Sequence, residues 1–399
     1  MKTDHFKKFF LFGILLAGAE LSIACDVTLS PGASVAAAVS SAPSGATVCL
    51  NAGSYPAFNA SINKSSLTTI TASPGLSRSQ VSISSVNVGS SQNLAFVGMT
   101  IGSTNVSVPG GAASLHIQFR NNAFTGALNI FTPQNVNQDT RIDGNTFANV
   151  GQGATEGRLG VRGYNNNTVN GVVISNNVFS GSGPSDGVQI IGGAYGTVIG
   201  PGNEFVGIKQ SGCGTVHCDP IQFYGATRST ITGNYFHGNS TGLMVNGGDG
   251  PATITHNVFV TDGEYPDQIV RAGTSGDVIT HNTFANGANM RFGDSLGTVS
   301  NALIRDNIIT GSLNLQYGQT LSALGTIDHN LISGSAIGAG GIKGVPTYTG
   351  GSKPTTWAGY QLTSGSLGYK AASEGADMGA NSFGGALVAM PAPTNLQVK

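Results

Sequence analysis

The clearest pattern along the chain is a short unit, Asn-x-Phe, that returns at intervals of about 25 residues. Its Asn residues are Asn122, Asn145, Asn177, Asn203, Asn234, Asn257 and Asn282, and Asn307 and Asn330 continue the series with an aliphatic residue in the aromatic position. The successive separations are 23, 32, 26, 31, 23, 25, 25 and 23 residues. Periods of roughly 20–50 residues are typical of a solenoid, a propeller or an array.

Short alternating apolar runs lie between these units, for example Gly171–Ile174 and Thr253–Thr255. Alternation with a period of two predicts strands, and no uninterrupted amphipathic helical pattern separates the runs. Three short strands and three turns fill a repeat of this length, which predicts an all-β solenoid, the parallel β-helix. In such a coil each Asn and each Phe stacks on its equivalent about 4.8 Å away along the axis. The Asn can form a ladder through its side-chain amides. Both columns are therefore interpreted as scaffold.

Composition supports this fold and excludes others. Charged residues make up only 9% of the chain, against about 25% in ordinary soluble domains. A net charge of −1 with 39% apolar residues excludes disorder, and the scarcity of Lys, Glu and Arg argues against long exposed helices. The near-neutral balance provides no basic surface for nucleic acid, so we expect no nucleic-acid partner.

The first 24 residues are typical of an export signal. Lys2, Lys7 and Lys8 precede an apolar run, Phe9–Ala19, and Ser22–Ala24 supplies small residues for cleavage. This predicts a secreted or periplasmic protein. Lipidation of the Cys that follows is less favoured, because Ser22 stands where Leu is usual. No later segment is apolar enough to cross a membrane.

Four cysteines remain after the signal: Cys25, Cys49, Cys213 and Cys218. An even number in an exported chain indicates two disulfides. Proximity along the chain favours Cys25–Cys49 and Cys213–Cys218, although three connectivities are possible. Metal ligation by cysteine is the alternative, and the absence of a Cys-x-x-Cys pair disfavours it.

With its repeat and its two ends, the chain resembles the secreted right-handed parallel β-helix proteins that include pectate lyases, alginate lyases and mannuronan epimerases. The opening segment, Cys25–Leu50, looks like that family's capping helix and first strand, with Val35–Val39 as the helix. The segments Tyr360–Thr363 and Asp377–Ala380 are similar to its closing segment. The resemblance implies one right-handed domain of about ten coils over residues 25–390, with a tail at 391–399.

β-Helix proteins bind ligands on the outer face of a sheet, so we aligned the strand that precedes each Asn-x-Phe unit by its inward aliphatic residue. The inward column is Leu128, Val161, Val188, Ile221, Leu243, Ile269, Met290 and Leu315. The next residue of each strand points outward, and these residues are Asn129, Arg162, Gln189, Gln222, Met244, Val270, Arg291 and Gln316. Tyr164 lies two residues after Arg162, and Tyr224 lies two residues after Gln222. Flat polar groups interleaved with aromatic rings suit sugars. We therefore expect Arg162, Tyr164, Gln189, Gln222 and Arg291 to bind a polysaccharide, an ordinary solvated face being the alternative.

The second of the two longest intervals carries the densest chemistry. It contains Lys209, His217, Asp219, Tyr224 and Arg228, and the expected Cys213–Cys218 disulfide would fix its loop. Neighbouring coils add Asp186, His237, Asp267 and Arg271.

Two of these carboxyl groups are expected to form a pair. Asp186 and Asp219 occupy the same position in successive coils, roughly 5 Å apart, which would raise the pKa of one of them. Strict alternation turns both side chains inward, so their outward presentation requires a bend at Gly187 and Pro220.

These residues fit the cleavage or epimerisation of an acidic polysaccharide. Such a reaction needs a positive group to neutralise a uronate, a base for the carbon-5 proton and an acid for the leaving oxygen. Lys209, Arg228 or Arg271 could neutralise, His217 could act as base and Tyr224 as acid, with Asp219 beside them. Arg228 and His237 would add substrate contacts. We predict a polysaccharide lyase or epimerase that acts as a monomer.

Two other classes remain open. A glycoside hydrolase would use paired carboxylates among Asp186, Asp219 and Asp267. A non-catalytic glycan-binding protein is allowed by the scaffold alone. The Asp-Pro-His motif of the epimerases and the Asn-Thr-Asp motif of polygalacturonases are absent. No cofactor is required, and a calcium site around Asp262, Glu264 and Asp267 is a further hypothesis.

Overall fold

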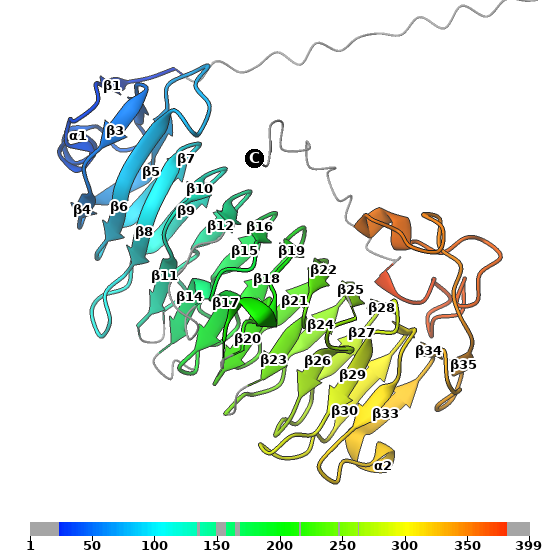
Figure 1. Cartoon of the computed structure of the whole chain (residues 1–399). Coiled ribbons are helices and arrows are strands. Elements are labelled where there is room, and N and C mark those ends of the chain that lie inside the picture. Colours follow the sequence, from blue (N-terminus) through cyan, green and yellow to red (C-terminus); the bar gives the residue numbers. More distant parts are fainter. Residues whose placement is uncertain are drawn as a thin grey trace, which may run out of the picture.

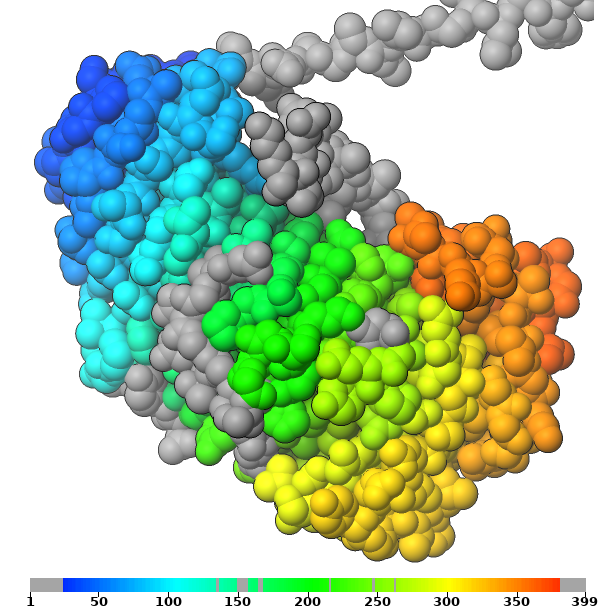
Figure 2. Space-filling view, viewed as in Figure 1, coloured from blue at the N-terminus to red at the C-terminus, as the bar shows by residue number. Residues whose placement is uncertain are grey.

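The computed structural model describes residues 24–133, 136–148, 157–163, 168–214, 217–245, 248–261 and 263–380. In this part the chain forms a parallel β-helix in which each strand pairs with its equivalents in the adjacent coils (Figure 1). This confirms the expected all-β, right-handed solenoid. In the space-filling view the colours follow one another in bands along the long axis, as stacked coils require (Figure 2). The predicted signal up to residue 23 and the tail at 391–399 lie outside the described residues.

Within the described residues the first sheet has thirteen strands, one from each successive coil. They are β1 (Val27–Leu29), β2 (Thr47–Leu50), β5 (Asn63–Ala72), β7 (Gln92–Val97), β9 (Leu115–Arg120), β12 (Arg141–Asp143), β15 (Val173–Ser175), β18 (Val198–Ile199), β21 (Thr230–Thr232), β24 (Thr253–Thr255), β27 (Val278–Thr280), β30 (Ala302–Arg305) and β33 (Gly325–Asp328).

The second sheet holds the Asn-x-Phe units, and the third follows it in each coil. The second contains β3 (Gly53–Tyr55), β10 (Ala123–Phe124), β13 (Thr146–Ala148), β16 (Val178–Ser180), β19 (Glu204–Val206), β22 (Tyr235–Asn239), β25 (Val258–Thr261), β28 (Thr283–Ala285), β31 (Ile308–Ile309), β34 (Leu331–Ile332) and β35 (Ile342–Lys343). The third contains β4 (Phe58–Ala60), β11 (Leu128–Thr132), β14 (Gly157–Gly163), β17 (Asp186–Ile191), β20 (Ile221–Tyr224), β23 (Leu243–Val245), β26 (Asp267–Arg271), β29 (Asn289–Phe292) and β32 (Leu313–Leu315). The long strands β6 (Val81–Val88) and β8 (Thr100–Val106) run through both sheets.

The repeated Asn residues form a continuous buried ladder at the corner between the first and second sheets. From Asn122 to Asn330 each side-chain Nδ2 donates to the Oδ1 of the Asn in the next coil at 2.9–3.1 Å. The same amide nitrogen donates to a backbone carbonyl of the first sheet, as in Asn234 to Ile199 O at 3.0 Å. Because the interior offers no water, this pairing satisfies polar groups that would otherwise destabilise the core.

The Phe residues of the same units form a parallel stack inside the coil. From Phe124 to Phe284 adjacent ring centroids lie 4.5–4.9 Å apart, with interplanar angles of 3–10°. The predicted interpretation of both columns as scaffold is confirmed.

The amino-terminal end is closed as expected. Helix α1 (Val35–Ser41) begins after Ser34, whose hydroxyl accepts from Ala37 N, and buries Val35 and Val39 over the first coil. The Cys25–Cys49 disulfide ties β1 to β2, and the Cys213–Cys218 disulfide closes a loop described below. Both predicted pairings are confirmed. In the described part of the chain, no helix is long and apolar enough to span a bilayer.

The carboxyl-terminal segment packs on the side of the coil. Residues 344–380, here called the C-terminal strap, include the helical turn η2 (Trp357–Tyr360) and lie against the outer face of the second sheet (Figure 1). Tyr360 and Met378 pack there with Val258 and Ile308. The strap thus covers apolar side chains that the outward face of this sheet would otherwise expose.

The short helix α2 (Leu321–Leu324) precedes β33.

Interrupting the ladder should destabilise the whole coil. In Asn234→Ala the buried amides of Asn203 and its neighbours lose their partners, so we expect the free energy of unfolding to fall by about 2–4 kcal/mol. Urea denaturation followed by circular dichroism measures the loss. Asn63→Ala, at an exposed position of β5, is the control and should change stability by under about 0.5 kcal/mol. Equal losses in the two variants would contradict the structural role of the ladder.

Candidate active site

The loop between β19 and β20 is described for residues 207–214 and 217–220, and its first part is held on the coil that follows it. Ile208 N donates to Asn239 Oδ1 at 2.9 Å, and Gln210 N donates to Ser240 Oγ at 2.8 Å. The helical turn η1 (Gln210–Gly212) leads into the disulfide, and Cys218 is completely buried. Lys209, in the held part, is half-buried, and His217, next to Cys218, is exposed.

Two carboxyl groups are buried beneath this loop. Asp219 N donates to Asp186 Oδ1 at 2.8 Å, and the Thr241 hydroxyl donates to Asp219 Oδ1. Both Asp side chains are fully buried, and Asp219 Oδ2 has no hydrogen-bond partner among the residues that the structure describes. The predicted adjacency of Asp186 and Asp219 is confirmed.

Both carboxyl groups are fully buried, so neither reaches the surface. The strand is irregular at this point, because the consecutive amides Gly187 N and Val188 N both donate to the next coil, to Asp219 O and Pro220 O, each at 2.9 Å. Strict alternation therefore does not fix the direction of Asp186, and its outward presentation stays a prediction.

Burial changes the proton affinity of this pair. Burial, and then the charge of Asp219, raises the pKa of Asp186 to about 8. Burial also raises the pKa of Asp219 to about 6, opposed by the Thr241 hydrogen bond and by the nearby His217. Because two ionised carboxylates would repel each other in a dry site, the pair retains a proton near neutral pH.

A buried arginine beside the pair escaped the sequence analysis. Arg158 on β14 donates to Ser180 O at 2.8 Å, Gly181 O at 2.5 Å and Ser185 Oγ at 3.3 Å. Its charge is close enough to lower the pKa of Asp186. One feature of the sequence could have identified Arg158. It is a charged residue in a chain with few charges, and it lies in the longest interval between two ladder Asn residues.

The outward face of the third sheet carries a line of mostly polar side chains, interrupted at Gly160, Met244 and Val270 and here called the outward polar row. Strand register places in it Asn59, Asn87, Asn105, Asn129, Gly160, Gln189, Gln222, Met244, Val270, Arg291 and Asn314. Gln189 Nε2 donates to Gln222 Oε1 and to Asp186 Oδ2, both at 3.2 Å. The row and the buried pair are thus parts of one hydrogen-bonded system.

Register corrects the predicted column at two coils. Val161 pairs with Ile130 and Ile190, so Leu159 is the true equivalent of Leu128. Arg162 therefore lies in line with Phe131 and Ile191, where its Nε donates to Asn129 Oδ1 at 2.9 Å. In the last coil Leu313, and not Leu315, pairs with Met290. A shift of two residues preserves the alternation, which is why the pattern alone did not detect it.

Tyr224 and Arg228 lie at the far end of β20 from the loop. Tyr224 is 51% exposed, and exposed Arg228 lies over the Tyr195 ring at 5.5 Å. Arg291 is on the same sheet three coils from Gln222 and pairs with Asp294 at 2.6 Å. Tyr164 lies outside the described residues.

Two predicted site residues lie elsewhere. Arg271 is completely buried inside the coil, where it pairs with Asp277 at 2.9 Å and lies over the Phe223 ring. It cannot neutralise a substrate from that position. His237 is on the second sheet, stacked on Tyr235 and paired with Glu204 at 2.7 Å. The structure does not bring it to the third-sheet face.

The calcium hypothesis stays a prediction. Asp267 accepts from Asn289 at 3.0 Å and from Asn314 at 3.1 Å, and Glu264 accepts from the Ser240 hydroxyl at 2.5 Å. These oxygens already have protein donors, and Asp262 lies outside the described residues.

The raised pKa values predict a pH-dependent stability. When the pKa of an acid is higher in the folded state than in the unfolded state, its protonation stabilises the fold. This stabilisation is complete at pH values below the unfolded-state pKa and is lost as the pH rises through the folded-state pKa. The melting temperature should therefore fall between about pH 4 and pH 8 through Asp186 and Asp219. Asp186→Asn, which keeps the acceptor for Asp219 N, should flatten this fall. Thermal unfolding at a series of pH values measures it; exposed Asp26→Asn should follow the wild type, and an unchanged slope in Asp186→Asn would contradict the assignment.

Comparison with known proteins shows a likeness in fold. No protein-family model and no curated protein matches the sequence. Among solved structures, the PL6 family alginate lyase AlyGC has a TM-score of 0.53 at 13% identity, covering 85% of this chain and 57% of that one. A point mutant of the same enzyme gives 0.54 at 14%, with the same coverage.

A PL6 family polysaccharide lyase from Pseudopedobacter saltans gives a TM-score of 0.48 at 12% identity, covering 77% of this chain and 84% of that one. The match with AlyGC covers 57% of that chain, so this chain spans little more than half of its length. At these identities the likeness shows a shared fold: this chain is a right-handed parallel β-helix of the architecture found in the PL6 alginate lyases.

Proposed function

We propose that the protein is a secreted polysaccharide lyase that cleaves an acidic polysaccharide by removing the carbon-5 proton of a uronate. The observation that carries this proposal is the disulfide-closed loop with Lys209 and His217 above a buried Asp pair, at one side of the outward polar row. Two disulfides favour an exported protein. The fold shared with alginate lyases is in accord with the proposal.

The amino-terminal part of the outward polar row provides a surface for a linear sugar chain, whereas Gln189 and Gln222 are only 5% and 9% exposed. At its amino-terminal end Asn87 donates to Asn59 at 2.6 Å and Asn105 donates to Asn87 at 2.9 Å. A hollow of about 690 Å³ lies there, lined among others by these Asn residues and Phe131. Amides that are already held by one another lose little entropy when they bind hydroxyl groups. We infer that several sugar units lie along the row.

The loop supplies the chemical groups. Lys209 would neutralise the uronate carboxylate, which lowers the barrier to removing the adjacent proton. His217 would take this proton as the general base. The Asp219 carboxyl, which interacts electrostatically with His217, would stabilise the resulting imidazolium and act as a positioning residue.

The same imidazolium can complete the reaction. As the carbon-5–hydrogen bond breaks, the electron pair forms the carbon-4–carbon-5 double bond and expels the carbon-4 oxygen. The proton on His217 then passes to this leaving oxygen. One residue on one side of the sugar is therefore sufficient as both the base and the acid of the elimination. The products are a chain with a new reducing end and a chain with an unsaturated end.

This scheme gives Tyr224 another role than the predicted acid. Tyr224 lies three steps of extended strand beyond Ile221, about 10 Å further along β20, and His217 lies in the loop before this strand. A base at His217 and an acid at Tyr224 would therefore be too far apart to act on one glycosidic bond. With half its surface exposed, the Tyr224 ring is better suited to stack on a neighbouring sugar.

The hydrolase alternative loses support from the burial of its carboxyl pair. Asp186 and Asp219 are fully buried and bonded to neighbouring protein groups, so neither oxygen pair can contact a glycosidic bond. The glycan-binding alternative is distinguished by the assay below.

The proposal is tested with purified protein and a panel of uronate polysaccharides. New unsaturated ends absorb in the ultraviolet, and we expect this absorbance to rise with at least one polymer. His217→Ala should reduce the rate by about 10²–10⁴-fold, the contribution of a general base. His116→Ala, at an exposed first-sheet position, is the control and should retain full activity. Reducing ends without absorbance, or no product with any polymer, would contradict the lyase proposal.

Tyr224 is tested by a pair of variants. If the ring only stacks on sugar, Tyr224→Phe keeps the wild-type rate and Tyr224→Ala raises KM about tenfold with little change in kcat. Steady-state kinetics on the active polymer measure both. A loss of kcat of a hundredfold or more in Tyr224→Phe would restore Tyr224 as the acid.

A further inference from the structure

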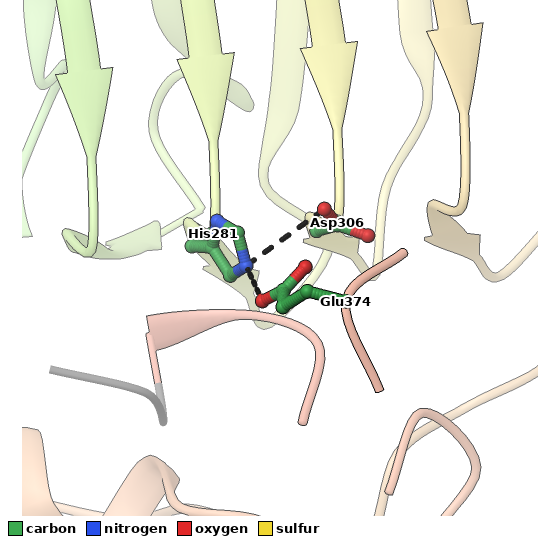
Figure 3. A group of neighbouring side chains, drawn as sticks. All are labelled: His281, Asp306 and Glu374. Carbon is green, nitrogen blue, oxygen red and sulfur yellow. Dashed lines mark hydrogen bonds and ion pairs between the residues drawn. The ribbon is translucent and has the colours of Figure 1, made fainter. Parts of the chain in front are cut away.

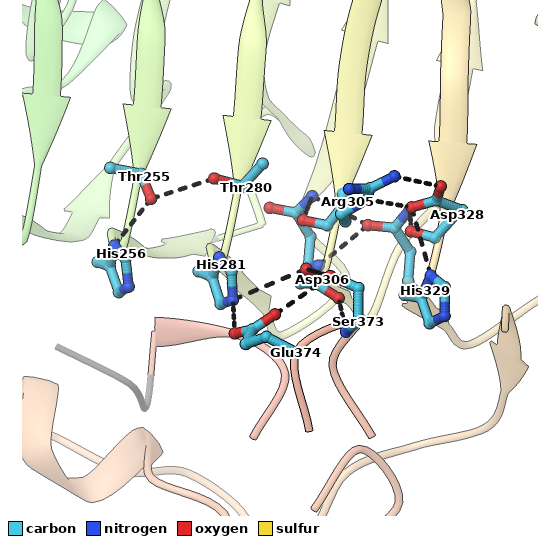
Figure 4. A network of polar contacts seen from close by, with 12 residues as sticks. Thr255, His256, Thr280, His281, Arg305, Asp306, Asp328, His329, Ser373 and Glu374 are labelled. Atoms are coloured by element: carbon cyan, nitrogen blue, oxygen red, sulfur yellow. Dashed lines mark hydrogen bonds and ion pairs between the residues drawn. The ribbon is translucent and has the colours of Figure 1, made fainter. Parts of the chain in front are cut away.

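A second cluster of titratable side chains lies at the opposite corner of the coil, beside the Asn ladder. The residue before each ladder Asn has a positive φ, and in four successive coils it is His256, His281, Asp306 and His329, with φ of 57°, 54°, 58° and 49°. This geometry stacks the four side chains in one column, and the rings of His256 and His281 lie 5.1 Å apart (Figure 4). Gly or Asn at all four positions would adopt the same left-handed turn conformation equally well. The presence of His and Asp instead therefore requires another explanation.

The C-terminal strap brings a third ligand type to this column. Glu374 Oε1 lies 2.7 Å from His281 Nε2, and Asp306 Oδ2 lies 3.8 Å from the same nitrogen (Figure 3). One donor atom from each of the three side chains lies within 4.8 Å of the others. The three residues come from two coils and from a segment 93 residues beyond His281.

Protein groups alone leave the charges of this cluster poorly balanced. His281 Nε2 can carry one proton, and the distances direct it to Glu374, since 3.8 Å to Asp306 is too long for a hydrogen bond. Asp306 is nevertheless 1% exposed, and its donors are the neutral Ser373 N and Oγ, both at 2.7 Å. The nearby Arg305 guanidinium is bound bidentately by Asp328 at 2.5 and 2.7 Å. Two carboxylates thus contact one imidazole, with the Arg305 charge near both of them but bonded to Asp328. A divalent cation would bind both carboxylates directly.

We propose that His281, Asp306 and Glu374 bind one divalent transition-metal ion, with Zn²⁺ as the representative ion. One imidazole nitrogen and two carboxylate oxygens are zinc ligands, with bonds of about 2.0–2.2 Å. Ligand atoms around such an ion lie about 3–3.6 Å apart, and the observed 2.7 and 3.8 Å lie on either side of this range. The imidazole disfavours Ca²⁺ and Mg²⁺, which prefer oxygen ligands.

The site would fasten the C-terminal strap to the coil. The strap covers the apolar outer face of the second sheet, and near the cluster its backbone contacts include Gly379 N to Asp306 O at 2.8 Å. An ion that joins Glu374 to His281 and Asp306 binds only when the strap is docked. Its binding therefore stabilises the docked, folded state in proportion to the free metal concentration.

Metal binding to tag-free protein, first dialysed against a chelator, tests the proposal. Calorimetric titration with ZnCl₂ should show one ion per chain, and thermal unfolding should shift upward by several degrees at zinc concentrations about 100 times the Kd. Titration with Co²⁺ should produce visible absorption bands of a protein-bound ion. His281→Gln and Glu374→Gln should each weaken zinc binding by about 100-fold or more.

A matched histidine provides the control. His116 has the same left-handed turn conformation and contacts Asp139 at 3.1 Å, and it belongs to no such three-ligand group among the described residues. His116→Gln should bind zinc as the wild type does. Glu374 is 49% exposed, so Glu374→Gln should fold normally, as circular dichroism will verify. Absence of stoichiometric binding by the wild type, or equal binding by folded Glu374→Gln, would overturn the proposal.

Discussion

The whole structure depends on one constraint: a polar group turned into the coil must find its partner on the next coil. From Asn122 to Asn330 the Asn ladder meets it, because each amide within the series both donates to and accepts from its equivalents 23–32 residues away. A coil that lacked this Asn would leave buried amides on both sides without partners. The chain can therefore vary its length only away from the ladder corner. The long loop of residues 207–220 lies at the corner between the second and third sheets, and it carries the candidate catalytic groups.

The same constraint explains where the few charges are. Arg271 with Asp277, and Asp186 with Asp219 and Arg158, are buried at corners where adjacent coils meet. Their cost of burial is offset by partners that strand register holds in place. Other charged groups, such as Lys209 and Arg228, remain at the surface. A low content of charge thus reflects a scaffold built from stacked neutral side chains, and it makes each exposed charge near the outward polar row informative about function.

Several features could be predicted because they repeat at nearly constant separation. The ladder, the Phe stack, both disulfides and the adjacency of Asp186 and Asp219 all follow from equivalent positions in successive coils or from proximity along the chain. The positions of Arg162 and Leu315 could not be fixed, because loops of unequal length precede their strands and a shift of two residues leaves the alternation intact.

By itself, then, the sequence determined the coil, its period and its buried columns, since these contacts recur between neighbours of fixed separation. Only the tertiary structure decided that Asp277 pairs with buried Arg271 and that His237 faces another sheet. It alone also brought Glu374 to His281 and Asp306. The strap that carries Glu374 is not part of the repeat, and its docking depends on the shape of an apolar surface assembled from many coils. No local pattern encodes such a contact, because its two sides acquire their complementary form only when the coils are stacked.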